Sequence, residues 1–366
     1  MGDSKTIILA AGGTGGHIFP AEALAEVLRA RGFDPQLITD HRFHDYNKSS
    51  ADGMLRSIPI HTIRAGSLGG GLTKKLKSVV GILLGTLQAA RLIRQLQPIA
   101  VVGFGGYPSF PTMLAAVLLK RRTILHEQNS VLGKVNRALA DRVTFIATTY
   151  ADTQKIPDGA RAKVRHTGNP VRAAIQVLSQ LAYSELAADG MMRLLVIGGS
   201  QGASMFSTVV PEAMALLPEN LRARIRLDQQ CRAVELKEVR ARYEAIHMQV
   251  DLAPFFSDVA ARVANTHLVI SRAGASSVAE LMVAGRPAIL VPLPSATDNH
   301  QYFNAQAVED KGAGWVVTQD AFTPASLANR LETLMQVPKR LSECAAAMRQ
   351  LGTPNAADLL ADVVVG

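Results

Sequence analysis

The chain has 366 residues, of which 48% are hydrophobic and 19% are charged, and it contains two cysteines. This length favours two domains over one, and two cysteines cannot form a disulfide framework, which indicates a reducing compartment. No apolar run reaches the roughly 20 residues that span a bilayer, and residues 1–5 lead directly into an apolar run, so neither a spanning segment nor a secretory signal is expected.

Positive charge is concentrated in the first half of the chain. Residues 1–172 contain 23 Lys and Arg against 11 Asp and Glu, whereas the remainder is close to neutral, and the whole chain carries +9. This asymmetry indicates that the first half meets an extended anionic surface. Aromatic residues make up only 5%, which favours anionic lipid over nucleic acid as the partner. An ordinary solvated basic surface is the alternative.

Short apolar runs alternate with helical patterns along the whole chain. Strands are expected in the first half near 6–11, 36–39, 58–63, 100–105, 123–126 and 143–147. Strands are expected in the second half near 194–198, 224–227, 247–252, 268–271, 288–292 and 315–318. Repeated strand-then-helix order predicts an α/β protein with two doubly wound, Rossmann-like parallel sheets.

The domain boundary is expected near 167–172, where a strand pattern stops at Pro170. The predicted domains are therefore 1–172 and 173–340. Residues 341–366 form a helical tail, expected to pack near the domain junction and to be broken at 352–354, where Gly and Pro interrupt the helical pattern.

The first loop is rich in glycine. Gly12, Gly13, Gly15 and Gly16 stand between an apolar run and a helical pattern, and His17 follows them. The loop lacks the last glycine of the dinucleotide fingerprint and the Lys of a P-loop. Glycine permits close approach of the backbone to a ligand, a helix N-terminus suits phosphate, and histidine suits proton transfer near neutral pH. A turn that merely needs glycine is the alternative.

Other loops that could bind a ligand also follow predicted strands. They cover 103–109, 126–129, 198–203 and 271–277. Ligands of open α/β sheets bind beyond the carboxyl ends of the strands. Four such loops, spread over both halves, predict a cleft between the domains that is lined by glycine backbone.

The segment 74–97 begins with Lys74, Lys75 and Lys77 and continues with a long apolar run. A basic and apolar helix of this kind can lie in a membrane interface. A core-facing helix with a lysine-rich start is the alternative, and periodicity alone favours it slightly.

Together these loops resemble those of the MurG family of GT-B glycosyltransferases, the peptidoglycan enzymes that add N-acetylglucosamine to lipid I. The resemblance covers nearly the whole chain and is carried by 12–17, 103–109, 126–129, 168–172, 198–203, 271–280, 285–287, 298–301 and 304–305. It implies UDP-N-acetylglucosamine bound by the second domain, the lipid I acceptor bound by the first, and lipid II as product. It also implies a peripheral position on the cytoplasmic face of the inner membrane and contact with a cell-wall synthesis complex.

The resemblance assigns roles to individual residues. His17 would be the general base. The substrate-binding residues would be Thr14, Gly15, Gly16, Asn129, Arg172, Ser200, Phe256, Ala275, Ser276, Ser277, Val278, Ala279, Glu280 and Gln301.

Several of these substrate-binding assignments concern the nucleotide. Ser200 and the loop around it would hold phosphate, Glu280 would accept hydrogen bonds from the ribose, and the backbone of Phe256 would pair with uracil. Gln301 would bind hydroxyl groups of the sugar, and Arg172 would contact the nucleotide.

Each assignment has a structural alternative. Residues 277–280 also fit a capping box, in which Glu280 would serve its own helix. Phe256 could pack in the core, and Arg172 could form an interdomain salt bridge. His17 could shape its turn. His126 and Glu127 are second-choice bases that could instead order a loop.

The donor is α-linked and the family's product is β-linked, so the reaction is expected to be a single in-line displacement with inversion. The acceptor hydroxyl is a weak nucleophile, which a general base would activate. The sequence contains no Asp-x-Asp, so the departing UDP is expected to be stabilised by helix N-termini, with no cofactor and no protein-held metal.

Three other functions stay open. The chain could be a GT-B transferase for a different lipid, such as diacylglycerol. It could be a UDP-sugar 2-epimerase, which would need no lipid-facing basic half. It could also be a non-enzymatic module that binds a nucleotide.

Overall fold

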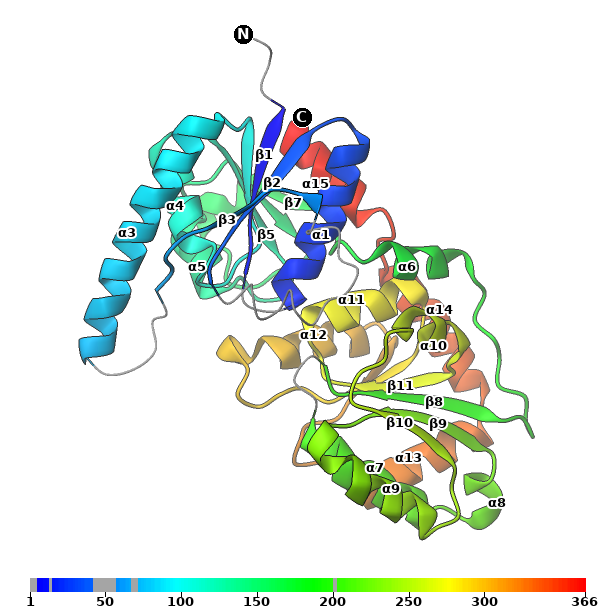
Figure 1. The fold of residues 1–366 in the computed structure, drawn as a ribbon. Helices are drawn as coiled ribbons and strands as arrows, with labels where there is room; N and C mark the ends of the chain where they lie inside the picture. The colour runs from blue at the N-terminus through cyan, green and yellow to red at the C-terminus, as the bar shows by residue number, and fades with distance from the viewer. Residues whose placement is uncertain (1–4, 13–14, 42–56, 67–71, 200–202) are drawn as a thin grey trace. The chain divides into compact units, whose positions relative to one another are not determined.

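The computed structural model describes residues 5–12, 15–41, 57–66, 72–199 and 203–366, with the side chains of 72–77 left out of the description. The chain divides into two compact units (Figure 1). Unit 1 comprises Met1–Arg172 and Thr353–Gly366, and unit 2 comprises Ala173–Gly352. The chain therefore passes from unit 1 to unit 2 and returns to unit 1 at its end.

Unit 1 is built on a parallel sheet with the strand order β3-β2-β1-β4-β5-β6-β7. Its strands are β1 (Thr6–Ala10), β2 (Asp34–Thr39), β3 (Ile60–Thr62), β4 (Ala100–Gly103), β5 (Arg122–Glu127), β6 (Phe145–Thr148) and β7 (Val164–His166). Its helices are α1 (Gly15–Ala30), α3 (Leu72–Leu96), α4 (Phe110–Leu118), α5 (Lys134–Leu139), the 3₁₀ helix η2 (Asp158–Lys163) and α15 (Ala356–Val365).

The central strand β1 is buried on both faces, as its unbroken apolar sequence requires of a parallel strand. Ile7 and Leu9 belong to the core cluster that contains Leu24 of α1 and Leu360 of α15. Ile8 belongs to the cluster on the opposite face, which includes residues of α3 and α4. The alternating direction of the side chains thus places one helical layer on each side of the sheet.

Unit 2 repeats this plan with the strand order β10-β9-β8-β11-β12-β13, the order of a doubly wound sheet. Its strands are β8 (Met192–Ile197), β9 (Ile225–Gln230), β10 (Val250–Ala253), β11 (Leu268–Ser271), β12 (Ala288–Leu290) and β13 (Gly314–Val316).

The helices of unit 2 lie on both faces of its sheet, with α7, α9 and α13 on one side and α10 and α11 on the other (Figure 1). The α-helices are α6 (Ala173–Gln176), α7 (Ser204–Leu216), α8 (Glu219–Arg222), α9 (Leu236–Glu244), α10 (Val259–Asn265), α11 (Ala275–Ala284), α12 (His300–Glu309), α13 (Pro324–Gln336) and α14 (Lys339–Leu351). The 3₁₀ helices are η3 (Val177–Gln180), η4 (Ala233–Glu235) and η5 (Thr297–Asn299).

The predicted fold class is confirmed, and each predicted strand has a counterpart among the observed strands. The short strand β7 was not predicted. Its three residues, Val-Arg-His, carry no apolar run, and β7 pairs only at the sheet edge with β6. Such a short edge strand leaves almost no periodic signal in the sequence.

The C-terminal segment differs from the single tail that was expected over 341–366. It forms two helices separated at the predicted break, and they belong to different units. Helix α14 packs on α11 in unit 2, and α15 packs on α1 in unit 1. Arg31, directly after α1, forms ion pairs of 2.8 Å with Asp358 and 2.6 Å with Asp362 of α15.

Helix α3 buries apolar side chains near its carboxyl end and exposes others nearer its amino end, so the alternative of a core-facing helix is confirmed for only part of its length. Leu83 and Leu87 are 58% and 68% exposed, whereas Ala89 and Ile93, nearer the carboxyl end, are fully buried. Within the described residues, Ser78–Leu96 is the one helical stretch long and apolar enough to cross a membrane, with a mean hydropathy of 1.2. Its buried residues join the core of unit 1, so this helix is part of the layer that covers the sheet.

Candidate active site

His17 lies in the first turn of α1, directly beyond the carboxyl end of β1. The residue is partly exposed, while its Nδ1 atom is shielded from solvent. Gly15 and Gly16 begin the same helix, and Thr14 lies outside the described residues. A parallel sheet has therefore brought the candidate base to the edge where ligands of such sheets bind.

The imidazole of His17 lies against the loop that follows β4. Gly105 and Gly106 have φ values of +81° and +74°, a conformation that glycine adopts without the steric cost of a side chain. A Cβ atom on Gly106 would lie 3.2 Å from Nε2 of His17, and one on Gly105 would lie 3.6 Å from its Cε1. The glycines thus bring the loop backbone close to the histidine ring.

His126, at the end of β5, is fully buried and held at both ring nitrogens. Its Nε2 donates to the carbonyl of Gly168 at 3.1 Å, so its Nδ1 accepts the 3.1 Å hydrogen bond from Nε2 of Gln128. Burial lowers the pKa of His126 to about 4, and the charge of His17 adds to this effect. A neutral imidazole with both nitrogens engaged is suited to ordering the loop rather than to moving protons.

Glu127 is a buried carboxylate that holds the loop containing Asn129. Its Oε1 accepts from the backbone and side-chain N–H groups of Asn129, both at 3.0 Å. Its Oε2 accepts at 2.8 Å from the backbone of Gly133 and at 2.8 Å from Nδ2 of Asn136. Four hydrogen bonds leave this carboxylate as an anchor that orients Asn129.

Asn136 belongs to this cluster but was not predicted from the sequence. Its Nδ2 also donates to the carbonyl of His126 at 3.2 Å, and it lies 3.4 Å from the position of a Cβ on Gly105. It therefore joins the His126–Asn129 loop to the loop after β4, which lies against His17. A single asparagine within a short helix gives no sequence signal, because its partners are distant in the chain.

Arg172 is the last residue of the first segment of unit 1. Its guanidinium lies 5.0 Å from the ring centroid of Phe19, two residues after His17 on α1. Cation–π stacking of this kind fixes the arginine near the candidate base. The interdomain salt bridge considered above stays a prediction.

In unit 2, Gly198 and Gly199 follow β8, and Ser200 lies outside the described residues. The backbone N–H of Gly198 donates to Oε1 of Gln230 at 3.2 Å, and Nε2 of Gln230 donates to the carbonyl of Pro254 at 3.1 Å. Gln230 thus ties the loop after β8 to the loop after β10. Gln230 was not predicted as a site residue, and it lies three residues beyond the predicted strand 224–227, whereas β9 extends to it.

The loop after β10 contains two phenylalanines in opposite environments. Phe255 is 69% exposed, whereas the side chain of Phe256 is only 5% exposed. The side chain of Phe256 therefore packs in the interior, as its structural alternative proposed. The backbone of Phe256 stays at the carboxyl end of β10, where ligands of α/β sheets bind.

Helix α11 begins at Ala275, with Gly274 as its N-cap. The capping-box interpretation of residues 277–280 is therefore wrong, because Ser277 is the third residue of the helix and Glu280 lies in its second turn. Glu280 is partly exposed, as are Ala275, Ser276 and Ser277. A helix start of this kind presents N–H groups and positive partial charge to an anion.

The side chains of Val278 and Ala279 point into the interior and are 0% and 2% exposed. The N–H of Val278 donates to the carbonyl of Gly274 at 3.0 Å. These two residues can therefore contribute to binding by shaping the first turn of α11, whereas their side chains cannot reach a ligand.

Gln301 and His300 open helix α12. Oε1 of Gln301 accepts from the backbone of Leu293 at 3.0 Å, which fixes the side chain beside the loop after β12. Nδ1 of His300 donates to the carbonyl of Thr297 at 2.7 Å, so Nε2 is its outward-facing nitrogen. Further along α12, buried Asn304 donates to the carbonyl of Ala273 at 3.2 Å and joins α12 to the start of α11.

A cavity of about 980 Å³ lies elsewhere in unit 2 and contains none of the predicted substrate-binding residues. It is lined by residues around the amino ends of β8, β9 and β10, including Arg193, Arg226 and Arg262. Geometry at the strand carboxyl ends is the stronger guide to the ligand site, because the loops there carry the glycines and the helix start. Across the described ranges, no three His, Cys, Asp or Glu side chains are grouped so as to hold a metal ion.

Two doubly wound parallel-sheet units, with glycine-rich loops and helix starts at the strand ends, form the GT-B fold of nucleotide-sugar enzymes. Domain models of glycosyltransferase family 28 match both parts of the chain, the N-terminal domain over residues 7–148 and the C-terminal domain over residues 193–360. The chain belongs to this family and, within it, to the MurG family.

Individual relatives agree with this assignment. A protein of Rhodospirillum centenum is 49% identical over 98% of this chain and 94% of its own length. That protein is named UDP-N-acetylglucosamine--N-acetylmuramyl-(pentapeptide) pyrophosphoryl-undecaprenol N-acetylglucosamine transferase. The crystal structure of Acinetobacter baumannii MurG has a TM-score of 0.79 at 30% identity and covers 98% of both chains.

A more distant structure shares the fold alone. The UDP-N-acetylglucosamine 2-epimerase described from Listeria monocytogenes has a TM-score of 0.64 at 14% identity and covers 97% of this chain. The architecture by itself therefore does not separate a transferase from an epimerase. The separation comes from the identity to the transferases.

Proposed function

We propose that the chain transfers N-acetylglucosamine from UDP-N-acetylglucosamine to undecaprenyl-pyrophosphoryl-N-acetylmuramoyl-pentapeptide, lipid I, and so produces lipid II. The observation that carries this proposal is the 49% identity, over nearly the full length of both chains, to a transferase named for these substrates. The geometry of the strand-end loops supports it.

Unit 2 would bind the donor. The first turn of α11, with Ala275, Ser276 and Ser277 shaped by Val278 and Ala279, would hold the diphosphate together with the loop of Ser200. Glu280 would accept hydrogen bonds from the ribose, the backbone of Phe256 would pair with uracil, and Gln301 would bind hydroxyls of the sugar. The fixed Oε1 of Gln301 leaves its amide N–H₂ as the donor for this contact.

Unit 1 would bind the acceptor and border the transferred sugar. Thr14, Gly15, Gly16 and Asn129 would contact that sugar. The hydrogen bonds of Asn129 to Glu127 keep its position fixed without a ligand, which lowers the cost of ordering it on binding. Arg172 would contact the nucleotide.

The reaction is an in-line displacement. The acceptor hydroxyl oxygen forms a bond to C1 of the sugar while the bond from C1 to the UDP oxygen breaks, with inversion at C1. His17 takes the hydroxyl proton, a role that typically accelerates such a step about 10²- to 10⁴-fold. His126 is not used, because burial keeps it neutral and both of its nitrogens are engaged.

The departing UDP gains negative charge on its terminal phosphate. The N–H groups at the start of α11 would stabilise this charge electrostatically. We expect transfer to continue when the purified protein is treated with a chelator. Activity that is lost with chelator and restored by stoichiometric metal would contradict this part of the proposal.

Unit 1 would attach peripherally to the anionic cytoplasmic face of the inner membrane. Helix α3 exposes Val79, Val80, Leu83, Leu84 and Leu87, whose spacing places them on one side of the helix. We call these five residues the α3 apolar face. Helix α3 runs along α4 (Figure 1), which itself ends in the 66% exposed Leu118.

Basic residues accompany this apolar surface. Arg91 and Arg94 lie further along α3, and Lys120 and Arg121 follow α4. Exposed apolar side chains beside basic ones suit a bilayer interface with anionic lipid, where each basic residue near the surface is worth about 1 kcal/mol. A protein partner from a cell-wall synthesis complex is a further proposal that rests on the family alone.

The decisive experiment measures transfer of labelled N-acetylglucosamine to a lipid I analogue by wild type, His17→Ala and Glu280→Ala. We expect His17→Ala to lose turnover and keep its affinity for UDP. Glu280→Ala should lose affinity for the donor. Full activity in His17→Ala would remove it as the base.

The same assay separates the other functions. Conversion of the donor without any acceptor would indicate an epimerase. Transfer to diacylglycerol in place of lipid I would indicate a different lipid acceptor. Binding of UDP with no turnover on any acceptor would indicate a binding module.

A further inference from the structure

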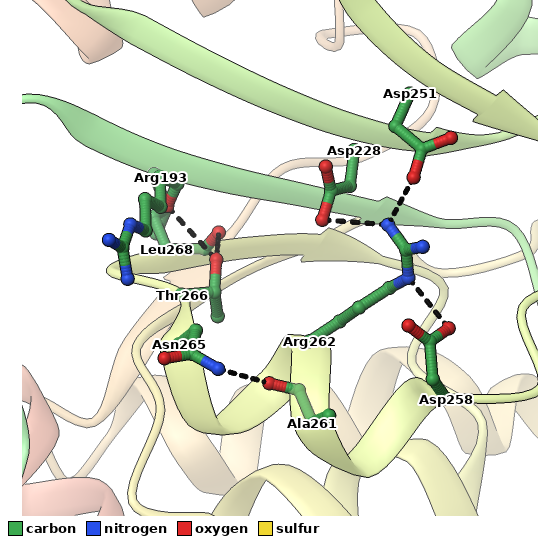
Figure 2. A network of polar contacts seen from close by, with 9 residues as sticks. All are labelled: Arg193, Asp228, Asp251, Asp258, Ala261, Arg262, Asn265, Thr266 and Leu268. Carbon is green, nitrogen blue, oxygen red and sulfur yellow. Dashed lines mark hydrogen bonds and ion pairs between the residues drawn. The ribbon is translucent and has the colours of Figure 1, made fainter.

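Arg262 of α10 joins three aspartates, from β9, from β10 and from the start of α10 (Figure 2). Its Nη1 lies 2.9 Å from Oδ2 of Asp228 on β9 and 2.7 Å from Oδ2 of Asp251 on β10. Its Nε donates at 2.8 Å to Oδ1 of Asp258, the N-cap residue of α10. One guanidinium thus connects two strands and the start of a helix.

The strand register makes this cation necessary. Asp251 lies directly opposite Asp228 in the parallel pair of β9 and β10. Like charges directly opposite each other destabilise a strand pair. Because Arg262 contacts both carboxylates, it offsets their repulsion at the point where β10, the edge strand of the sheet, joins its neighbour.

Arg262 also covers the ring of Phe256. The guanidinium carbon lies 3.9 Å from the ring centroid, a close cation–π stack. Phe256 lies between Asp251 on β10 and Asp258 at the start of α10. Arg262 therefore contacts Asp251 before this loop, Asp258 after it, and the ring of Phe256 within it.

The loop is held from its other side by Gln230, which donates to the carbonyl of Pro254 at 3.1 Å. Between these two attachments, the backbone of Phe256 has little freedom to move. A binding group that is ordered before the ligand arrives loses less entropy when the ligand binds.

We propose that Arg262 is a positioning residue that fixes the Phe256 backbone for the base of the donor nucleotide. This inference rests on the proposed function, in which that backbone pairs with uracil. Arg262 acts through Phe256 and the three aspartates and does not contact the nucleotide itself. Its loss should weaken nucleotide binding and reduce the preference for uracil while leaving the chemical step intact.

The test compares Arg262→Met and Arg262→Lys with wild type. Methionine keeps much of the apolar stem and removes the charge, whereas lysine keeps the charge and loses the planar fork. Arg242→Met is the matched control, because Arg242 pairs with Glu212 at 3.1 Å and Glu238 at 2.7 Å on helices remote from the Phe256 loop. Calorimetry gives the Kd values for UDP and CDP, and steady-state assays give kcat and the KM for the donor.

For Arg262→Met we expect the Kd for UDP and the donor KM to rise about tenfold, because the Phe256 loop would then have to be ordered when the nucleotide binds, and a tenfold change corresponds to about 1.4 kcal/mol. The ratio of CDP to UDP affinity should move toward one, and kcat should stay within about threefold of wild type. For Arg262→Lys we expect values of Kd, KM and the CDP to UDP ratio between those of wild type and Arg262→Met. Arg242→Met should match wild type.

An unchanged Kd for UDP in Arg262→Met, or an unchanged CDP to UDP ratio, would overturn the inference. If Arg262→Met does not fold, the lysine variant and Phe256→Leu carry the same comparison, and wild-type selectivity in both also overturns it. A wild-type protein that fails to transfer to lipid I would instead contradict the proposed function, while the difference in UDP binding would still be measurable.

Discussion

His17 lies with its Nε2 atom against Gly106, at the position where a Cβ atom on that glycine would come within 3.2 Å. The two residues come from loops after β1 and β4, which are neighbouring strands of the sheet. The position of the candidate base therefore depends on the left-handed backbone conformation of Gly106. Changes at the glycine should affect the chemistry more than the binding of the donor.

We predict that Gly106→Ala lowers kcat about 10- to 100-fold, the range expected when a catalytic group is displaced by up to an ångström. A side chain at φ +74° is strained, and its methyl group would push the imidazole aside. The affinity for UDP should not change, because the residues proposed to bind the diphosphate, ribose and base lie chiefly in unit 2. Initial rates with a lipid I analogue and calorimetry with UDP provide the two measurements.

Gly32→Ala is the control for this prediction. Gly32 has φ +80°, and no atom lies within 4 Å of the position of its Cβ. The alanine should cost about 1–2 kcal/mol of stability through the backbone and leave kcat unchanged. Equal losses of kcat in both variants would mean that backbone strain alone explains the result at Gly106.

A second prediction concerns His126 and pH. Burial lowers its folded-state pKa from 6.5 to about 4, so below pH 6.5 the unfolded chain binds a proton that the folded protein does not. This difference leaves stability unaffected above pH 6.5 and lowers it progressively as the pH falls toward 4. At pH 5 the loss relative to pH 7 should be about 2 kcal/mol.

His126→Gln removes this titration, and its amide can still donate to Gly168. The variant should lose less stability than wild type between pH 7 and pH 5. Urea unfolding followed by circular dichroism measures the difference. Fluorescence of Trp315, the chain's single tryptophan, separates the unfolding of unit 2. Parallel pH slopes in the two proteins would show that His126 is not the group responsible.

A third prediction concerns the buried Arg286, which is 1% exposed. Its guanidinium donates to the carbonyls of Val263 at 2.9 Å, Ala264 at 2.9 Å and Ala284 at 2.7 Å, near the ends of α10 and α11. Burial and the nearby Arg349 lower its pKa. The partial negative charge at the carboxyl ends of α10 and α11 thus stabilises the buried positive charge of Arg286.

Arg286→Lys should destabilise unit 2 by about 2–4 kcal/mol, because one ammonium group cannot satisfy carbonyls from both helices. Unfolding in urea, followed by the fluorescence of Trp315, provides the measurement. Arg224→Lys is the control, since partly exposed Arg224 also donates to carbonyls, those of Ala188 and Gly190, that water can reach. If Arg286→Lys lowers the free energy of unfolding by less than about 1 kcal/mol, the role of Arg286 in stabilising the carboxyl ends of α10 and α11 is contradicted.

A fourth prediction concerns the α3 apolar face. Leu83→Glu combined with Leu87→Glu should lower binding to vesicles that contain anionic lipid at least about tenfold, because apolar burial is lost and like charge is added. Both side chains are mostly exposed, so thermal stability should change little. Vesicle flotation at low and high salt measures binding and its electrostatic part.

The control is Val234→Glu, which adds one negative charge, half of that added by the double variant, at an apolar residue that is 85% exposed in unit 2. This variant should bind vesicles as wild type does. If it loses binding as strongly as the double variant, added charge and not the α3 apolar face would account for the effect.

The sequence was sufficient for the central strands of both sheets, because buried parallel strands such as β1 and β11 are apolar along nearly their whole length, whereas the short edge strand β7 was missed. Helix starts were less predictable. Glu280 was assigned an alternative role in a capping box, and the structure shows that the helix begins at Ala275, three residues earlier than that motif requires. The glycine N-cap carries no side-chain signal, so the boundary could not be read from the pattern.

Contacts between segments that are far apart in the sequence could not be predicted either, for a related reason. The stack of Arg262 on Phe256 and the link from Gln230 to Pro254 depend on the register of β9 against β10. Periodicity predicts that such strands exist but does not align one against the other. The exposed side of α3 could not be predicted for a similar reason. An apolar helix has the same sequence pattern whether its apolar side packs against protein or against another surface.

Helix α15 has a consequence for the order in which the protein matures. Leu360, Ala361 and Val364 supply part of the core that also contains Ile7 and Leu24. During synthesis these three residues follow the whole of unit 2. Unit 1 is therefore begun first and completed last, after the whole of unit 2 has been made. A nascent chain stopped at residue 352 would hold a finished unit 2 and a unit 1 with part of its core open to water.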